Sequence, residues 1–444
     1  MNKITHFCSM GMKTFKYCFV HYSSMLSKER LKQVLAEQRD SILKRDFGIE
    51  RELLKEIESK IRLPHAVVIT GIRRCGKSTL LRQIIKKFYA DSEFYYISFE
   101  DERLLNFRAE DFNLIFEALI ELFGEKKTFF IDEIQNVENF EAFVRRFCDN
   151  GFKFFVSGSN AKLLSRELGT KLTGRHTDIT LNPFTFSEFL SLRGVKFEKN
   201  MLYKTIEKAK IKKYFDEYLA GGGMPEFLIY KDASSLAGVY EDIVIKDIAV
   251  RHNVGDVHRL RELYQYLITN FSNKFSYRSL NKIMGMGSVN TVKKYISYLE
   301  GAFFAKTVGK FDYSLKKQMI NDKKIYISDN GFIKVISTRT TQDRGRLLEN
   351  LVFNTLKISS NPFYYANKRE CDFLLLKNNE IKSAMQVCWE LNEENREKEL
   401  EGLIGALKEF NLKEGTILTH DEEDELTAEG KKIKITPVYK WLLA

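Results

Sequence analysis

The sequence has little of what marks secreted, disulfide-stabilised or membrane-spanning proteins. Its six cysteines are Cys8, Cys18, Cys75, Cys148, Cys371 and Cys388. None of them forms a CxxC pair, and their spacing predicts neither a zinc site nor a disulfide framework. Reduced thiols in a cytoplasmic protein are therefore the expectation. No run of 18 apolar residues occurs, so the sequence predicts no membrane-spanning helix.

Signal-peptide features and chain-breaking residues are also scarce. Residues 1–24 lack the continuous apolar segment of a signal peptide. Met1, Met12 and Met25 are each candidate translation starts, because the first clear helical pattern begins near Ser27. The whole chain contains only five prolines, which predicts a compact chain with few breaks in its regular structure.

Length and charge are what the chain has in abundance. With 444 residues it is too long for one core, and two to four domains are expected. The net charge is +11, and the window from Asp256 to Lys324 holds thirteen Lys or Arg against five Asp or Glu. Such a basic segment is typical of nucleic-acid binding, although an ordinary solvated surface has the same composition.

The periodicity of apolar residues predicts an α/β chain. Residues 27–63 have a helical pattern. From Ala66 to Thr180, short apolar runs alternate with helical stretches, which indicates a parallel sheet with right-handed crossovers. Residues 184–250 are expected to be mostly helical. Residues 257–324 read as helices followed by a β-wing, and from Gly345 helices and strands mix again.

A phosphate-binding loop is the clearest motif. The pattern GxxxxGK[ST] occurs in the stretch made of Gly71, Ile72, Arg73, Arg74, Cys75, Gly76, Lys77, Ser78 and Thr79. The two glycines let backbone N–H groups point inward as an anion nest, at the positive end of the following helix. Lys77 is expected to contact the β- and γ-phosphates of ATP, Ser78 to ligate Mg²⁺, and Thr79 to reach an α-phosphate oxygen.

Two acids complete the predicted site. Residues 128–131 form an apolar run, and Asp132 and Glu133 follow it directly. Asp132 is expected to hold Mg²⁺ together with Ser78, and Glu133 to polarise the attacking water as general base. The alternative interpretation is a pair of surface acids after a core strand.

Further polar residues are candidates for the same site. Asn160 or Ser159, after the apolar run 154–156, can position the water, or can simply cap a helix. Arg175 is a candidate arginine finger, in its own subunit or in a neighbour's. Arg73 and Arg74 are unusual inside such a loop, and Arg74 is a candidate contact for DNA or a neighbouring subunit.

These motifs together resemble the AAA+ family ATPases of archaea and bacteria that carry a C-terminal nuclease-like domain. The strings that carry the resemblance are TGIRRCGKSTLL, YYISFEDERL, FFIDEIQNVENFE, FVSGSNAKLLSRELGTKLTGR, NPFTFSEFL, GGGMPE, DIVIKDI, GRLLENLVFNTL and PVYKWLL. The resemblance implies a P-loop NTPase core, a helical lid and a winged helix. The domain boundaries expected on this basis are 1–64 (helical extension), 65–182 (AAA+ core), 183–255 (lid), 256–325 (winged helix) and 326–444 (restriction-endonuclease-like domain).

The basic segment contains the candidate winged helix. A glycine turn at Gly285–Gly287 precedes a helix that Ser288 or Asn290 can cap. On this helix Lys293 and Lys294 lie away from the apolar stripe, where a recognition helix makes its groove contacts. DNA contact and a structural or protein-binding role both remain open, because charge alone does not read sequence.

The C-terminal segment resembles a restriction-endonuclease-like fold with an altered site. Glu349 and Asp372 occupy the first two acidic positions, but Gln386 and Cys388 replace the acid and the lysine of the third strand. A site binds a hard cation such as Mg²⁺ less tightly when its ligands carry less negative charge. We therefore expect an inactive or very weak nuclease. Lys382 or Lys368 can substitute for the missing lysine, and Glu349 can instead pair with Arg369.

Two functions follow from the sequence. The first is an ATP-hydrolysing AAA+ protein that engages DNA, with ATP and Mg²⁺ as cofactors. The second is a nucleotide-dependent signalling or interaction switch with slow turnover, whose partner is a protein or a second copy of the chain. No membrane partner is expected.

Overall fold

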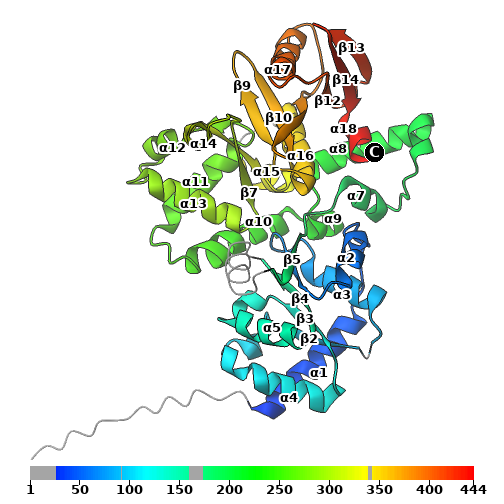
Figure 1. Cartoon of the computed structure of the whole chain (residues 1–444), viewed down its shortest axis with the longest axis vertical. Coiled ribbons are helices and arrows are strands. Elements are labelled where there is room, and N and C mark those ends of the chain that lie inside the picture. The colour runs from blue at the N-terminus through cyan, green and yellow to red at the C-terminus, as the bar shows by residue number, and fades with distance from the viewer. Residues whose placement is uncertain (1–26, 92, 160–173, 339–342) are drawn as a thin grey trace, which may run out of the picture.

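The structure is a computed structural model that describes residues 27–91, 93–159, 174–338 and 343–444. The candidate start methionines and Asn160 lie outside these residues. The sheet of the N-terminal part lies at the lower end of the molecule in Figure 1, and the C-terminal sheet lies at the upper end. Within the described residues, every helix is too short or too polar to cross a membrane.

A five-stranded parallel sheet forms the centre of the N-terminal part. Its strands are β1 (Ala66–Thr70), β2 (Phe94–Ser98), β3 (Thr128–Asp132), β4 (Lys153–Gly158) and β5 (His176–Thr180). They lie in the order β2-β3-β4-β1-β5, and every neighbouring pair is parallel. Strands β1 and β3 are buried along their whole length, which explains their uninterrupted apolar sequences. This arrangement fits the core of a P-loop NTPase.

Helices cover both faces of this sheet. They are α1 (Lys28–Lys44), α2 (Leu54–Ile61), α3 (Lys77–Phe88), α4 (Phe112–Phe123) and α5 (Phe140–Asp149), with 3₁₀ turns at Glu102–Leu104, Ala109–Asp111 and Ile134–Asn136. Alternate strand residues face opposite ways. Phe130 and Phe155 stack on the side of α3, whereas Phe129 and Phe154 stack on the side of α1, α4 and α5.

The single helical pattern expected for residues 27–63 was wrong, because two helices flank an irregular segment. Helix α1 ends at Lys44, and Arg45 already has an extended backbone. Gly48 then adopts a positive φ of 58°, a conformation that glycine reaches at little cost. Gln83 of α3 holds this segment, since its amide donates to Phe47 O and Ile49 O at 2.7 Å each.

A helical layer follows the first sheet. It contains α7 (Phe186–Leu192), α8 (Thr205–Gly221), α9 (Pro225–Tyr230), α10 (Ala233–Asp242) and the π-helix η5 (Ile243–Val250), with a 3₁₀ turn at Lys199–Tyr203. Its apolar side chains belong to the same core cluster as α3 on one side and the C-terminal helices on the other. The apolar core therefore runs without a break from the first sheet into the second half of the chain.

The basic segment forms four helices and a small antiparallel sheet of order β6-β8-β7. Its elements are α11 (Val257–Thr269), β6 (Lys274–Phe275), α12 (Tyr277–Met284), α13 (Val289–Gly301), β7 (Ala305–Gly309), α14 (Leu315–Ile320) and β8 (Lys323–Ile327). Ser288 caps α13 by accepting from Thr291 N at 3.1 Å. The name winged helix for this segment stays a prediction.

The C-terminal part is a mixed six-stranded sheet with helices against it. Its strand order is β13-β14-β12-β11-β10-β9. The elements are α15 (Asn330–Ile336), α16 (Arg344–Ser359), β9 (Phe363–Ala366), β10 (Glu370–Lys377), β11 (Glu380–Val387), α17 (Arg396–Glu409), β12 (Glu414–Thr419), β13 (Asp424–Ala428), β14 (Lys431–Pro437) and α18 (Val438–Leu442). Helix α18 packs back against α7 and α8, as Figure 1 shows.

Candidate nucleotide site

The loop between β1 and α3 has the backbone that a phosphate cradle requires. Gly71 has φ 153° and Gly76 has φ 102°. A Cβ at Gly71 would lie 2.2 Å from Leu181 O, so no other residue fits there. Helix α3 begins at Lys77, directly after Gly76, and therefore directs its free N–H groups into the loop.

Lys77 lies inside this loop and faces the second acid of the site. Its Nζ donates to Gly71 O at 3.3 Å and to Ile72 O at 3.4 Å, and it lies 3.6 Å from Glu133 Oε1. Burial lowers the pKa of Lys77, but the charge of Glu133 and other neighbours outweighs it and raises the pKa above its usual value. The side chain is therefore a fixed ammonium, held by weak contacts that a phosphate can replace.

Ser78 and Asp132 lie next to each other at the carboxyl edge of the sheet. Ser78 and Asp132 line the same cavity, and Ser157 Oγ donates to Asp132 Oδ1. Burial, followed by the charge of Glu133, raises the pKa of Asp132. A divalent cation would relieve this unfavourable burial of negative charge.

Glu133 is aimed at the loop by an unusual backbone and two polar partners. It has a positive φ of 51°, which is uncommon for a side chain of this size and typical of functional positions. Gln135 Nε2 donates to Glu133 Oε2, and Ser159 Oγ donates to the same oxygen at 3.4 Å. Sequence reasoning singled out Ser159 only as a water-positioning or capping residue and did not consider Gln135. Asn160 lies outside the described residues.

Arg175 lies at the opposite edge of the sheet from this chain's own phosphate loop. It precedes β5, and its carbonyl accepts from Ala66 N at the start of β1. Strand β1 has five residues, which span about 15 Å in an extended strand. The guanidinium pairs with Asp149. The geometry therefore brings together Lys77, Asp132 and Glu133 but not Arg175.

Both arginines of the loop pair with carboxylates of the helical layer. Arg73 makes two hydrogen bonds of 2.9 Å to the buried Asp247 of η5. Arg74 reaches Glu226, in the GGGMPE turn, at 2.8 and 3.0 Å. Neither side chain is free in this chain for the DNA or subunit contact that the sequence left open for Arg74. The helical layer thus holds the phosphate loop from outside.

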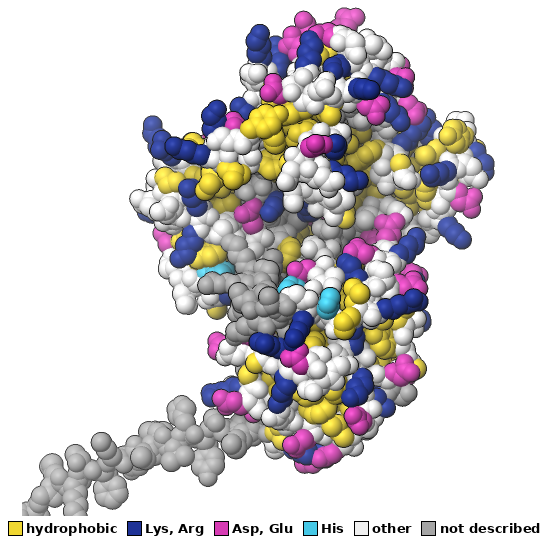
Figure 2. Space-filling model, in the orientation of Figure 1, with side chains coloured by type: hydrophobic (Ala, Val, Ile, Leu, Met, Phe, Trp, Pro, Cys, Tyr) yellow, Lys and Arg dark blue, Asp and Glu magenta, His cyan; other side chains and the backbone are white. Residues whose placement is uncertain are grey.

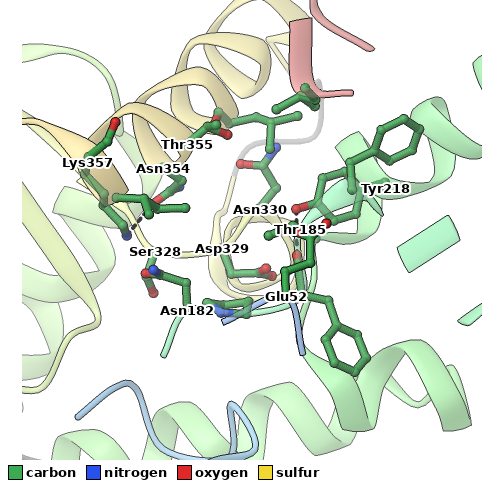
Figure 3. A pocket seen from close by; sticks show the side chains of 18 residues that line it. Glu52, Asn182, Thr185, Tyr218, Ser328, Asp329, Asn330, Asn354, Thr355 and Lys357 are labelled. Carbon is green, nitrogen blue, oxygen red and sulfur yellow. Dashed lines mark hydrogen bonds between the residues drawn. The ribbon is translucent and has the colours of Figure 1, made fainter. Parts of the chain in front are cut away.

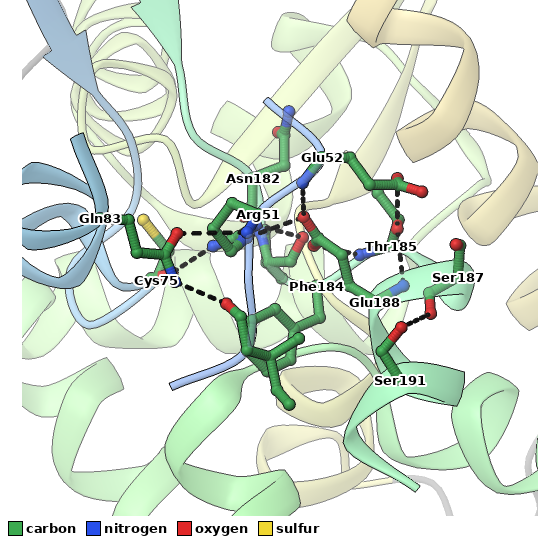
Figure 4. Close-up of polar contacts among 12 residues, drawn as sticks. Arg51, Glu52, Cys75, Gln83, Asn182, Phe184, Thr185, Ser187, Glu188 and Ser191 are labelled. Carbon is green, nitrogen blue, oxygen red and sulfur yellow. Dashed lines mark hydrogen bonds and ion pairs between the residues drawn. The ribbon is translucent and has the colours of Figure 1, made fainter. Parts of the chain in front are cut away.

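Arg51 binds the backbone of the phosphate loop. The sequence alone did not indicate this residue. Its Nη1 donates to Cys75 O at 3.0 Å, and its Nε donates to Glu188 Oε1 at 2.9 Å, as Figure 4 shows. Its Nη2 donates to Asn182 O at 2.6 Å. An isolated arginine in an irregular segment carries no sequence signal, so only the fold shows that it connects the phosphate loop to the start of the helical layer.

The residues present fit Mg²⁺ with a nucleotide. Magnesium in such sites takes few protein ligands and completes its octahedron with water and phosphate oxygens. The adjacent hydroxyl of Ser78 and carboxylate of Asp132 provide that minimal set. When bound with ATP, the ion would neutralise charge on the β- and γ-phosphates.

The acids of the C-terminal segment meet a lysine from another strand. Lys324 of β8 lies 2.8 Å from Glu349 and 3.0 Å from Asp372. Burial raises the pKa of Glu349 to about 7, although Lys324 opposes this effect. The alternative pair of Glu349 with Arg369 does not form, and Arg369 instead binds Glu401 at 2.8 Å.

The substitutes proposed for the missing lysine lie elsewhere. Lys382 pairs with Glu380, and Lys368 is exposed at the rim of the cavity that Glu349 and Asp372 line. Cys388 is buried, and burial raises the pKa of its thiol. Sequence reasoning missed Lys324 because it precedes the acids and lies on a strand assigned to the basic segment.

A cavity of about 290 Å³ lies where the N-terminal part meets the C-terminal half. Figure 3 shows polar side chains from both sides around it, among them Asn182, Ser328, Asp329 and Lys357. Ser328 Oγ is buried without a hydrogen-bond partner among the described residues. Burial raises the pKa of Asp329 to about 7. The two halves therefore meet through a polar junction as well as through the shared apolar core.

Comparison with known families agrees with this geometry. Residues 64–190 match the model of the AAA domain, and residues 212–343 match a domain of unknown function, DUF8612. An uncharacterised protein of Methanocaldococcus jannaschii, MJ1544, is 34% identical over 442 residues, covering 95% of this chain and 97% of that one. An uncharacterised protein of Haemophilus influenzae is 30% identical over 345 residues, or 74% and 84% of the two chains.

Among solved structures, the RuvB Holliday junction branch migration motor of Thermotoga maritima is 18% identical to this chain. The match covers 63% of this chain and 87% of RuvB, with a TM-score of 0.26. At these values the likeness says nothing about the function of this chain.

Proposed function

Because this chain belongs to the same family as MJ1544 of Methanocaldococcus jannaschii and carries an AAA domain, we propose that it is an ATP hydrolase of the AAA+ class. The observation that carries the proposal is the convergence of Lys77, Asp132 and Glu133 at one edge of the sheet. A cation for the phosphates, a ligand for Mg²⁺ and a base for water are the parts that hydrolysis of the phosphoanhydride bond of ATP requires.

Each residue has a distinct role in this proposal. The loop from Gly71 to Thr79 binds the phosphates through its N–H groups. Lys77 moves from its carbonyl contacts to the β- and γ-phosphates, and Ser78 and Asp132 hold Mg²⁺. Glu133, fixed by Gln135 and Ser159, accepts a proton from the attacking water.

Two variants test the hydrolysis proposal. Lys77→Ala should abolish ATP binding, because it removes the only cation inside the described phosphate loop that is not paired with the helical layer. Glu133→Gln should still bind ATP but lower kcat by about 10²–10⁴-fold, the usual contribution of a general base. Binding is measured by calorimetry and turnover by phosphate release. Unchanged ATP affinity in Lys77→Ala would disprove the proposal.

We extend the proposal to the rest of the chain. The segments are 65–182 as ATPase core, 183–255 as lid, 256–325 as a winged helix that contacts DNA, and 326–444 as a nuclease-like domain without nuclease activity. The exposed lysines Lys293 and Lys294 on α13 support the DNA contact. Arg175 is proposed to act on a neighbouring subunit's nucleotide, since it lies far from its own.

A second candidate function is a nucleotide-dependent switch with slow turnover. It is favoured by the ion pairs Arg73–Asp247 and Arg74–Glu226, which join the phosphate loop to the lid. Nucleotide binding in the loop would then be coupled to the position of the lid. Stimulation of ATP hydrolysis by single- or double-stranded DNA favours the first function. Slow, DNA-independent turnover with tightly retained ADP favours the second.

A further inference from the structure

Three carboxylates of the C-terminal segment converge on one ammonium group. Lys324 Nζ lies 2.8 Å from Glu349 Oε1, 2.6 Å from Glu370 Oε1 and 3.0 Å from Asp372 Oδ1. Its side chain is 3% exposed. Glu349 comes from α16, Glu370 and Asp372 come from β10, and Lys324 comes from β8. A buried cation therefore already occupies the point where these acids meet.

Further hydrogen bonds hold the cluster, although Glu349 Oε2 accepts none among the described residues. Tyr326 donates its hydroxyl hydrogen to Glu349 Oε1 at 2.7 Å, and Val387 N donates to Asp372 Oδ2 at 3.0 Å. Gln386, at the position of the third acid, accepts from Asp372 N through its oxygen and donates to Glu399 through its nitrogen. Its amide is thus committed to neighbours rather than offered to a metal.

The residues present therefore do not fit the divalent cation that a nuclease-like site implies. Such a cation needs several free carboxylate oxygens at 2.0–2.6 Å. Within the described residues, no group of three or more His, Cys, Asp or Glu is arranged to hold a metal ion. The ammonium of Lys324 lies between the acids and supplies the positive charge that they need.

The same contacts join two sheets. Lys324 lies directly opposite Lys274 in the antiparallel pair of β6 and β8, a placement of like charges that is unfavourable by itself. Lys274 also pairs with Glu370. Carboxylates of the C-terminal sheet therefore neutralise both lysines of the small sheet. Without these contacts, like charges would remain unpaired on both sheets.

We propose that Lys324 takes the place of the catalytic metal and converts a nuclease-like site into a fixed joint between the β6-β8-β7 sheet and the C-terminal sheet. This inference rests on the proposed nuclease-like assignment of residues 326–444. The joint fixes the basic segment relative to the C-terminal sheet, and hydrolysis of nucleic acid is lost because no metal position is left.

The test compares metal binding, DNA cleavage and stability in the full-length chain. The wild type should bind no Mn²⁺ that depends on Asp372, so Asp372→Asn should leave its calorimetric Mn²⁺ isotherm unchanged. Lys324→Met should gain one Mn²⁺ per chain, because the three carboxylates then lack their cation and can rearrange around an added one. It should also lower the thermal unfolding midpoint by about 3–5 °C, as expected for breaking a buried ion pair in a chain of this length, and Mn²⁺ should restore part of that loss.

Lys323→Met is the matched control, since Lys323 is the neighbouring residue of the same strand and binds Gln318 O instead of the acids. It should show neither the Mn²⁺ gain nor the large loss of stability. If Lys324→Met does not fold, the wild type and Asp372→Asn still decide the question.

The opposite result is equally clear. Mn²⁺ binding by the wild type that Asp372→Asn removes, or DNA cleavage that Lys324→Met removes and Lys323→Met keeps, would make Lys324 a catalytic lysine and overturn the proposal. ATP turnover is measured on the same wild-type sample. Failure of the hydrolase proposal would therefore appear in the ATP turnover, whereas failure of this inference would appear in the Mn²⁺ isotherm.

Discussion

Glu349 is a buried carboxyl whose charge is set by its neighbours. Burial raises its pKa from 4.5 to about 7, while Lys324 and Tyr326 favour the ionised form. Both partners contact Oε1, and the structure shows no hydrogen bond to Oε2 among the described residues. A glutamine can therefore keep the Oε1 contacts while losing the ability to titrate.

This environment predicts a pH-dependent stability. A carboxyl whose pKa is higher in the folded than in the unfolded chain stabilises the fold most at pH values below its unfolded-state pKa of 4.5. That contribution is lost as the pH rises to its folded-state pKa of about 7. The free energy of unfolding of the wild type should therefore fall across this interval, and that of Glu349→Gln should fall less. Denaturant unfolding at about pH 5 and about pH 7.5 measures both. An equal fall in the free energy of unfolding of the two proteins would contradict the raised pKa of Glu349.

Arg51 shows how one side chain can determine the geometry of a loop far from it in sequence. Its guanidinium contacts Cys75 O in the phosphate loop, Glu188 in α7 and Asn182 O between them. Removal of one partner from such a buried pair leaves an uncompensated charge. The loop, the irregular segment after α1 and the start of the helical layer therefore depend on each other.

At the scale of elements, the glycine turn after α8 joins three parts of the fold. A Cβ at Gly223 would lie 2.3 Å from Phe184 O, and a Cβ at Gly222 would lie 1.9 Å from Asp329 Oδ1. Gly223 N also donates to Asp329 Oδ2 at 2.5 Å. The absence of side chains lets the segment between β5 and α7 and the turn before α15 both approach the end of α8.

Gly223→Ala should therefore destabilise the chain by about 1–3 kcal/mol, because the added methyl group meets backbone that cannot move aside easily. Gly238→Ala is the matched control. Gly238 lies within α10, and an added Cβ there meets nothing within 4 Å. Alanine at that helical position should stabilise by about 0.5–1 kcal/mol. Chemical denaturation distinguishes the two variants, and equal effects would contradict this account of the turn.

At the scale of the whole molecule, the basic segment lies apart from the nucleotide site. Figure 2 shows Lys and Arg side chains at the left edge of the molecule, where Figure 1 places α12 and α14. The apolar core links this segment through the helical layer to α3. A conformational change at the first sheet can therefore be transmitted to the segment through packed elements rather than through a flexible linker.

If this segment binds DNA, affinity should fall steeply with salt, because each phosphate contact releases counterions. Lys293→Ala and Lys294→Ala should each weaken binding and lower the slope of log affinity against log salt by about 1. Lys196→Ala, an exposed lysine outside the segment, should leave the slope unchanged. Fluorescence anisotropy at several salt concentrations measures this. A flat salt dependence would exclude the basic segment as the contact.

The sequence alone determined the parts of this protein whose residues are close together in the chain. The phosphate loop, the strand that ends in Asp132 and Glu133, and the alternation of buried strands with helices all follow from local spacing and periodicity. These features depend on backbone geometry and on solvent exclusion, which short patterns encode.

Only the tertiary structure decided which distant side chains meet. Arg51 beneath the loop, Asp247 on Arg73 and Lys324 among the C-terminal acids join residues 24 to 174 positions apart. It also placed Arg175 at the far edge of the sheet. An ion pair depends on distance and burial in the folded chain, and a single sequence carries no signal for either.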